Sequence, residues 1–159
     1  MLENKIECLA FTAGQAARAS AVEYHNLNHW AKTGFVVPSL AEADGMDTCR
    51  AYSFGDVVAL AMAKRLRDAG LGLDAIRSVV AHLQQREYTG GKCNAVLVGS
   101  DDGSVVECDT KSAISALKNR RFGWVMDAGS VVAEMRAALK NARAPKRGKA
   151  RCVQELVNT

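Results

Sequence analysis

Two short helical segments near the N-terminus, joined by a tight turn, constrain the fold of this chain more than any other feature. The first segment starts at Thr12, where Thr12 and Gln15 have the spacing of a capping box. Residues 20–22 form the turn, and the stretch VEYHNLNHWAKTGFVVP that follows predicts a second helix over residues 23–33, ended by Gly34. Two short helices joined by a turn of three or four residues predict a helix-turn-helix.

The second helix has one apolar and one polar face. Leu27 and Trp30 have the spacing that docks a short helix on a core. The opposite face carries Tyr24, His25, Asn28, His29 and Lys32. In a helix-turn-helix this face contacts bases and phosphates, whereas on another amphipathic helix it is only solvated.

The polar segment after this helix predicts a wing. Residues 38–52 leave the apolar pattern, turn at Asp44-Gly45 and return through Arg50 and Tyr52. Arg50 is a candidate for phosphate contact, and Tyr52 can pack its ring while its hydroxyl donates to a phosphate.

Two further helices complete the predicted N-terminal domain. Ser53 caps a third helix over residues 54–69, which Gly70 closes. A fourth helix runs from residue 73 to about residue 83. Its buried face is predicted at spacings of three and four by Leu73, Ile76, Val80 and Leu83.

The second half of the chain has β-strand patterns as well as helical ones. Gly90-Gly91 predicts a linker, and the runs AVLVGS and SVVEC, separated by Asp-Asp-Gly, predict a β-hairpin. Asp109 or Thr110 then caps a helix that bears Ile114 and Leu117. A short apolar run over residues 124–126 precedes a last helix, whose stripe consists of Val131, Met135, Ala138 and Leu139.

We therefore predict a mainly α protein with four parts. Residues 1–88 form a winged helix-turn-helix domain, residues 89–92 a linker, residues 93–140 a small α+β segment for dimerisation or effector binding, and residues 141–159 a flexible basic tail. Residues 1–88 hold nine Lys and Arg against ten Asp and Glu, a net charge of −1, although the whole chain has +4. DNA binding by the first half must therefore rest on local geometry.

Composition excludes several other classes. The chain lacks an apolar run of membrane-helix length and a signal-peptide pattern, so we expect a cytoplasmic protein with no membrane partner. Five cysteines without a CxxC pair predict reduced thiols, with Cys93 and Cys108 facing each other in the hairpin region as small apolar residues. The sequence shows no phosphate loop or nucleophile motif, so we expect no enzyme, cofactor or metal site.

Residues 11–83 resemble the DNA-binding domain of the MerR family of bacterial transcription regulators. The resemblance is carried in order by FTAGQAARAS, by VEYHNLNHWAKTGFVVP with its Gly-to-Pro exit, by the wing return in CRAYSFGDVVAL, and by LRDAGLGLDAIRSVV. It implies a dimer on a palindromic operator in double-stranded DNA, with RNA polymerase as a further partner at the promoter. It also implies that Tyr24, His25, Asn28, Lys32, Arg50 and Tyr52 contact DNA.

The chain departs from the family pattern at three places, one of which is the wing, where Glu42, Asp44 and Asp47 lie near the expected path of the phosphates. Asn28 stands where the family has Arg, so the helix loses charge, although an Asn can pair bidentately with adenine. The long dimerising helix that usually follows the fourth helix is replaced by the α+β segment. Two alternatives stay open: an architectural or excisionase-like protein that bends DNA, and a protein-interaction module that has lost DNA binding.

Overall fold

The computed structural model describes residue 6 and residues 9–40, 50–88, 95–100, 103–118 and 123–140. The predicted linker, the basic tail and most of the predicted wing lie outside these ranges, as do four of the five cysteines. The elements in chain order are β1 (Phe11–Thr12), α1 (Ala13–Ser20), α2 (Tyr24–Lys32), β2 (Ala51–Tyr52), α3 (Phe54–Asp68), α4 (Leu73–Gln85), β3 (Val96–Ser100), β4 (Val105–Cys108), α5 (Thr110–Leu117), β5 (Gly123–Asp127) and α6 (Ala128–Lys140).

Capping boxes start two of the helices. The Thr12 hydroxyl accepts from the backbone N–H of Gln15 at 3.2 Å, and the Gln15 side chain accepts from the Thr12 N–H at 3.0 Å. Ser53 and Asp56 form the same reciprocal pair at the start of α3. These bonds satisfy N–H groups that a helix start otherwise leaves unpaired. The predicted starts of α1 and α3 are confirmed.

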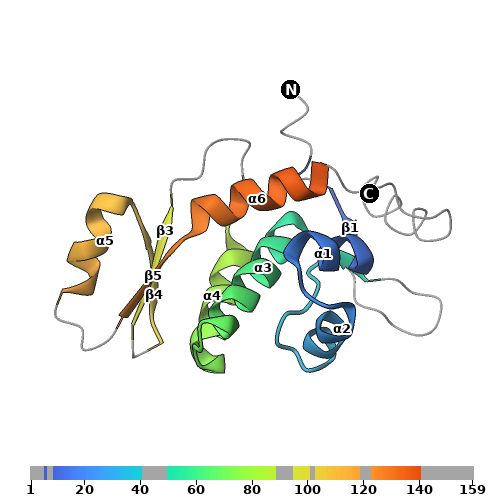
Figure 1. Ribbon diagram of the computed structural model, residues 1–159, viewed down its shortest axis with the longest axis horizontal. Helices are drawn as coiled ribbons and strands as arrows, with labels where there is room; N and C mark the ends of the chain where they lie inside the picture. The colour runs from blue at the N-terminus through green and yellow to red at the C-terminus, as the bar shows by residue number, and fades with distance from the viewer. Residues whose placement is uncertain are drawn as a thin grey trace.

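The helices pack around α3, which is buried over most of its surface. Helix α4 lies along α3, α1 packs against it from another side, and α2 contacts α1 (Figure 1). The helix-turn-helix and the mainly α class are thus confirmed. One prediction for α4 is wrong: Leu73, the first residue of the helix, is 57% exposed, whereas Ile76, Val80 and Leu83 are buried.

The second half forms a three-stranded antiparallel sheet in the order β4-β3-β5. The β3–β4 hairpin is confirmed, with Gly103 at a positive φ of 81° in its turn. The apolar run at residues 124–126 is the third strand, β5, which the sequence did not identify. Cys108 pairs with Val96 in the hairpin register; Cys93 lies outside the described residues.

Helix α6 joins the two halves. It leaves β5 without a break and lies across α1 and α3 (Figure 1). Its residues Val131, Val132, Met135 and Leu139 belong to the same hydrophobic cluster as the buried residues of α2, α3 and α4, together with Leu97 of β3. The predicted division at residues 89–92 stays a prediction, but α6 shares its core with the N-terminal helices.

Candidate nucleic-acid interface

Helix α2 is anchored by its apolar face, so its polar face points outward. Leu27 and Trp30 are buried, and the Trp30 ring contacts Phe35 edge-on, with ring centroids 5.2 Å apart. A helix fixed on one side presents the opposite side to solvent. Tyr24, His25, His29 and Lys32 are exposed and Asn28 is half-buried. The predicted side chains of α2 therefore share one accessible face.

Arg50 and Asn28, which are 22 residues apart, form a direct hydrogen bond. The Arg50 guanidinium donates to the side-chain oxygen of Asn28. Because Arg is only a donor, the amide oxygen must face Arg50. This oxygen has a second lone pair and the amide NH₂ keeps its donors, so Asn28 can still pair with a base edge. The structure thus joins the end of the predicted wing to the middle of α2.

Tyr52, two residues after Arg50, lies in the core. Its side chain is fully buried, and among the described residues its hydroxyl has no hydrogen-bond partner. Burial raises the pKa of Tyr52 to about 12; the nearby Arg50 charge opposes this shift. In this arrangement the ring supports the Arg50 segment, and a phosphate contact would require the hydroxyl to become uncovered. The assignment of Tyr52 as a DNA contact stays a prediction.

Asp56 is a buried residue that the sequence did not single out. One carboxylate oxygen accepts from the backbone N–H and the hydroxyl of Ser39, both at 2.8 Å, and from the Ser53 N–H at 2.9 Å. The other oxygen accepts from the Gln84 amide at 2.8 Å. The spacing Ser53-x-x-Asp56 signals the cap, but not the bonds to distant residues. Asp56 thereby fixes the segment after α2 against α3 and α4.

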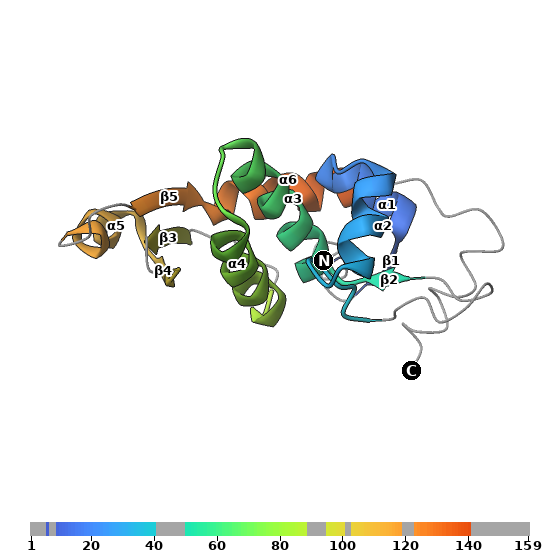
Figure 2. The ribbon, with the colours of Figure 1, turned by 90° about the horizontal axis from the view of Figure 1, so that it is seen from below.

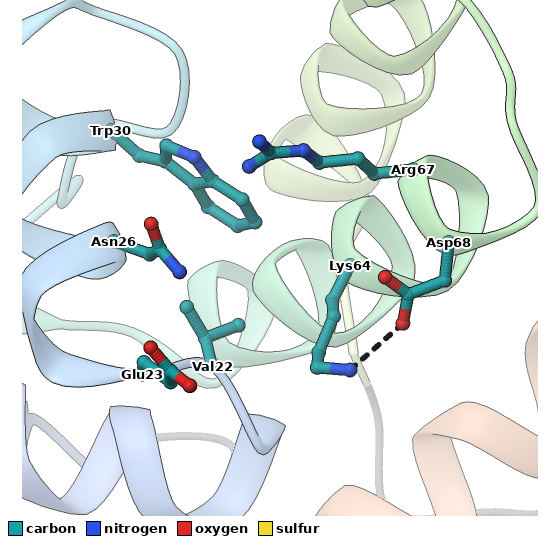
Figure 3. A pocket seen from close by; sticks show the side chains of 7 residues that line it. All are labelled: Val22, Glu23, Asn26, Trp30, Lys64, Arg67 and Asp68. Carbon is teal, nitrogen blue, oxygen red and sulfur yellow. Dashed lines mark hydrogen bonds and ion pairs between the residues drawn. The ribbon is translucent and has the colours of Figure 1, made fainter.

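The end of α3 approaches α2 through the charged side chain of Arg67. The Arg67 guanidinium lies 5.9 Å from the centroid of the Trp30 ring, and Lys64 pairs with Asp68 at 2.8 Å (Figure 3). A cavity of about 340 Å³ lies between the two elements, and the side chains that line it are Val22, Glu23, Asn26, Trp30, Lys64, Arg67 and Asp68 (Figure 3). Arg67 therefore stabilises the anchored side of α2 as well as carrying charge.

Comparisons with known proteins agree with this geometry. Residues 11–83 match the family described as MerR HTH family regulatory protein. An uncharacterized HTH-type transcriptional regulator of Mycobacterium bovis and another of Mycobacterium tuberculosis strain H37Rv are each 36% identical to this chain over 108 residues. The match covers 68% of this chain and 47% of each relative, so the chain spans about half their length. None of the helices in the described ranges has the length and apolarity needed to span a membrane.

Proposed function

Because residues 11–83 form a helix-turn-helix domain of the MerR family, we propose that this protein is a sequence-specific DNA-binding regulator of transcription. The observation that carries the proposal is the outward polar face of α2, with Asn28 held by Arg50. A recognition helix needs a firm dock on one side and free donors and acceptors on the other. Helix α2 meets both requirements.

In this proposal α2 lies in the major groove and its residues have separate roles. Asn28 pairs with a base, with adenine as the best geometric match. Tyr24, His25 and Lys32 contact neighbouring bases or phosphates. Arg50, at the end of the predicted wing, binds a phosphate while it keeps its bond to Asn28. Tyr52 holds this segment in place and would contact a phosphate only when uncovered.

A dimer on a palindromic operator fits the small number of cations on this surface. Lys32 and Arg50 are the only cations among the six proposed contact residues. Two protomers would neutralise about four phosphates, so log K should fall with log salt at a slope near −4. A much steeper slope would indicate further basic residues, such as those of the predicted tail. Within the same proposal the protein acts in the cytoplasm, with RNA polymerase as its partner at the promoter.

Selection from a genomic library, followed by fluorescence anisotropy, tests the proposal. Asn28→Ala should cost about 1–3 kcal/mol at the preferred sequence and relax the preference at one position. Arg50→Ala should weaken binding to all sequences. Asn26→Ala is the matched control, because Asn26 lies on the same helix but lines the cavity against α3; it should leave sequence preference unchanged.

Three results would count against the proposal. If Asn28→Ala and Arg50→Ala both leave affinity and preference unchanged, α2 is not the recognition helix. Strong bending of a recombination site without any effect at a promoter would favour an architectural protein. Failure of the full chain to bind any duplex, together with a stoichiometric protein partner, would favour an interaction module.

A further inference from the structure

Strand β5 ends the sheet, and its outer edge is the basis of this inference. In the order β4-β3-β5, β5 pairs with β3 on one side, and none of the described strands pairs with its other side. Figure 2 shows β5 at one edge of the sheet, with no described element alongside it. An edge strand presents unpaired N–H and C=O groups that can accept another strand.

The register tells which β5 groups point outward. Ser100 donates its N–H to Ser104 of the β4 side, so the even-numbered residues of β3 bond toward β4 and the odd-numbered ones toward β5. Leu97 and Gly99 pair with Met126 and Trp124 of β5. The backbone groups of these two β5 residues therefore face β3. Those of Gly123, Val125 and Asp127 face outward.

These outward residues are spaced symmetrically around Val125. We propose that β5 pairs antiparallel with β5 of a second copy, across a two-fold axis at Val125, and forms a continuous six-stranded sheet. Val125 then exchanges two hydrogen bonds with the partner's Val125, while Gly123 and Asp127 face the partner's Asp127 and Gly123. The inference rests on the proposed function, which requires a dimer, and it assigns the interface of that dimer.

The side chains of β5 suit this pairing. Val125 is 47% exposed and meets its own copy, so an apolar side chain gains an apolar neighbour. Trp124 lies opposite the partner's Met126 on the other face of the sheet, and both are half-buried in the single chain. Aromatic–sulfur and apolar cross-strand contacts are favourable, and the pairing places no like charges opposite each other.

Trp124 is held in position for this contact by Gly99. A Cβ atom on Gly99 would lie 2.1 Å from the Trp124 ring, so the indole occupies the space above the glycine backbone. Gly99 and Trp124 are direct cross-strand partners. This packing locks the register of β5 on β3, and with it the set of groups that points outward.

The opposite edge of the sheet is protected. Glu107 of β4 accepts hydrogen bonds from His82 of α4 and from Arg86, the residue that follows α4, and α5 packs against β3 and β4. A charged residue and covering helices blunt an edge strand. Residues 123–126 of β5 carry no charge. The two edges therefore differ, and β5 is the one fitted to a second copy.

Two substitutions at Val125 test the pairing. Val125→Lys places two ammonium groups opposite each other at the axis, and Val125→Pro removes an outward N–H without removing a bond to β3. Val106→Lys is the matched control: Val106 pairs with the same residue, Val98, and is 41% exposed, but lies on β4. Sedimentation equilibrium of the full chain gives the assembly state, and circular dichroism reports folding.

We expect a dimer for the wild type and for Val106→Lys, and a folded monomer for both Val125 variants, with dissociation constants raised at least about tenfold. A dimer that survives both Val125 variants, or a wild type that is monomeric at all concentrations, overturns the inference. DNA binding separates this outcome from the proposed function. A monomeric wild type that binds DNA leaves the function standing, whereas a β5-dependent dimer that binds no duplex leaves only the interface standing.

Discussion

The polar face of α2 and the edge of β5 are two exposed surfaces with opposite chemistry. Beyond its first turn, helix α2 pairs its own backbone groups, so it recognises a partner mainly through side chains such as Asn28 and Lys32. Strand β5 presents backbone groups and nearly neutral side chains. Side chains distinguish one sequence from another, whereas a strand edge pairs with any suitable strand. The difference suits α2 to specific recognition and β5 to association with an identical copy.

The two surfaces share one support. Helix α6 begins where β5 ends and packs against α1 and α3, and Arg65 of α3 pairs with Glu134 of α6. A rigid connection of this kind would set the distance between the two α2 helices of a dimer. Half-site spacing in DNA follows from such a distance. Substitutions in the helices or in the sheet therefore test whether the two surfaces depend on each other.

The largest expected effect comes from Asp56→Ala. The substitution removes the shared acceptor of four hydrogen bonds, which come from the N–H and hydroxyl of Ser39, the Ser53 N–H and the Gln84 amide. The Ser39 hydroxyl and the Gln84 amide each keep a second acceptor, in the Ser53 hydroxyl and the Val37 carbonyl. We expect a loss of about 3–5 kcal/mol in the free energy of unfolding, measured in urea. Helical circular dichroism and tryptophan fluorescence should shift together, because α6 joins both ends in one core.

The control for Asp56 is Asp68→Ala, which removes an exposed pair with Lys64 and should cost less than about 1 kcal/mol. Two separate transitions in Asp56→Ala, with the Trp124 signal unmoved, would show that the sheet folds independently of the helices. The shared core would then not couple the two surfaces.

A smaller effect, confined to the sheet, is expected for Gly99→Ala. The new Cβ would overlap the Trp124 ring, so Trp124 must move, at a cost of about 1–3 kcal/mol. Sedimentation should show a weakened dimer, while binding to a single half-site should persist. Gly14→Ala is the control: a Cβ there meets nothing closer than 4.0 Å, and α1 should gain about 0.5–1 kcal/mol. If Gly99→Ala weakens half-site binding as much as dimerisation, the α2 surface and the β5 edge are not independent.

Features that depend on nearby residues were predicted from the sequence, whereas features that depend on distant residues were not. Capping boxes, helical spacing and glycine ends are local, so α1 to α4 were predicted nearly to the residue. The exposure of Leu73 depends on which residues the fold brings beside the start of α4, and the bonds of Asp56 to Ser39 and Gln84 join distant segments. Neither has a local pattern. Strand β5 was missed because Trp-Val-Met is too short to show alternation. Its pairing with β3 is a tertiary contact.

The candidate site was predicted to a similar degree. Helical geometry alone places Tyr24, His25, Asn28 and Lys32 on one face, as the structure shows. The bond from Arg50 to Asn28 spans 22 residues and leaves no trace in sequence spacing. The full burial of Tyr52 likewise results from tertiary packing in the main hydrophobic cluster. Residue types therefore identify candidates, but only the fold decides which of them cooperate.

A still smaller effect, about 1–2 kcal/mol in the free energy of unfolding, is expected at Glu107, where α4 meets β4. Burial raises the pKa of Glu107, but hydrogen bonds from His82 and Arg86 outweigh it, so the pKa is lowered. A lowered folded pKa contributes stability above the unfolded value, which is lost as pH falls. Glu107→Gln should thus cost about 1–2 kcal/mol at pH 7, and the cost should shrink as the pH falls through the lowered pKa of Glu107. Urea unfolding at pH 7 and at pH 3 measures this difference.

Glu134→Gln provides the comparison, since its pair with Arg65 is exposed on both sides and should be worth less than about 1 kcal/mol. If the difference between Glu107→Gln and the wild type stays constant from pH 7 to pH 3, the carboxylate does not hold α4 against β4. Glu107 would then not protect the β4 edge, which is the main observed difference between the β4 edge and the β5 edge.

The smallest effect at neutral pH is expected for Tyr52→Phe, beneath the α2 surface. The hydroxyl is buried and has no partner among the described residues, so its removal should change the free energy of unfolding by less than about 1 kcal/mol at pH 7. Above pH 10 the unfolded chain loses the tyrosine proton while the folded chain, with a pKa of about 12, keeps it. The wild type should therefore lose about 1 kcal/mol relative to the variant by pH 11, as urea titrations can show. Tyr24→Phe, at an exposed position, should leave the alkaline loss of the wild type in place.

The Tyr52→Phe variant also tests whether Tyr52 contacts DNA. A fall of about fivefold in DNA affinity at unchanged stability would mean that the hydroxyl becomes uncovered and reaches a phosphate. The recognition surface would then extend from α2 to a residue that is buried in the free protein.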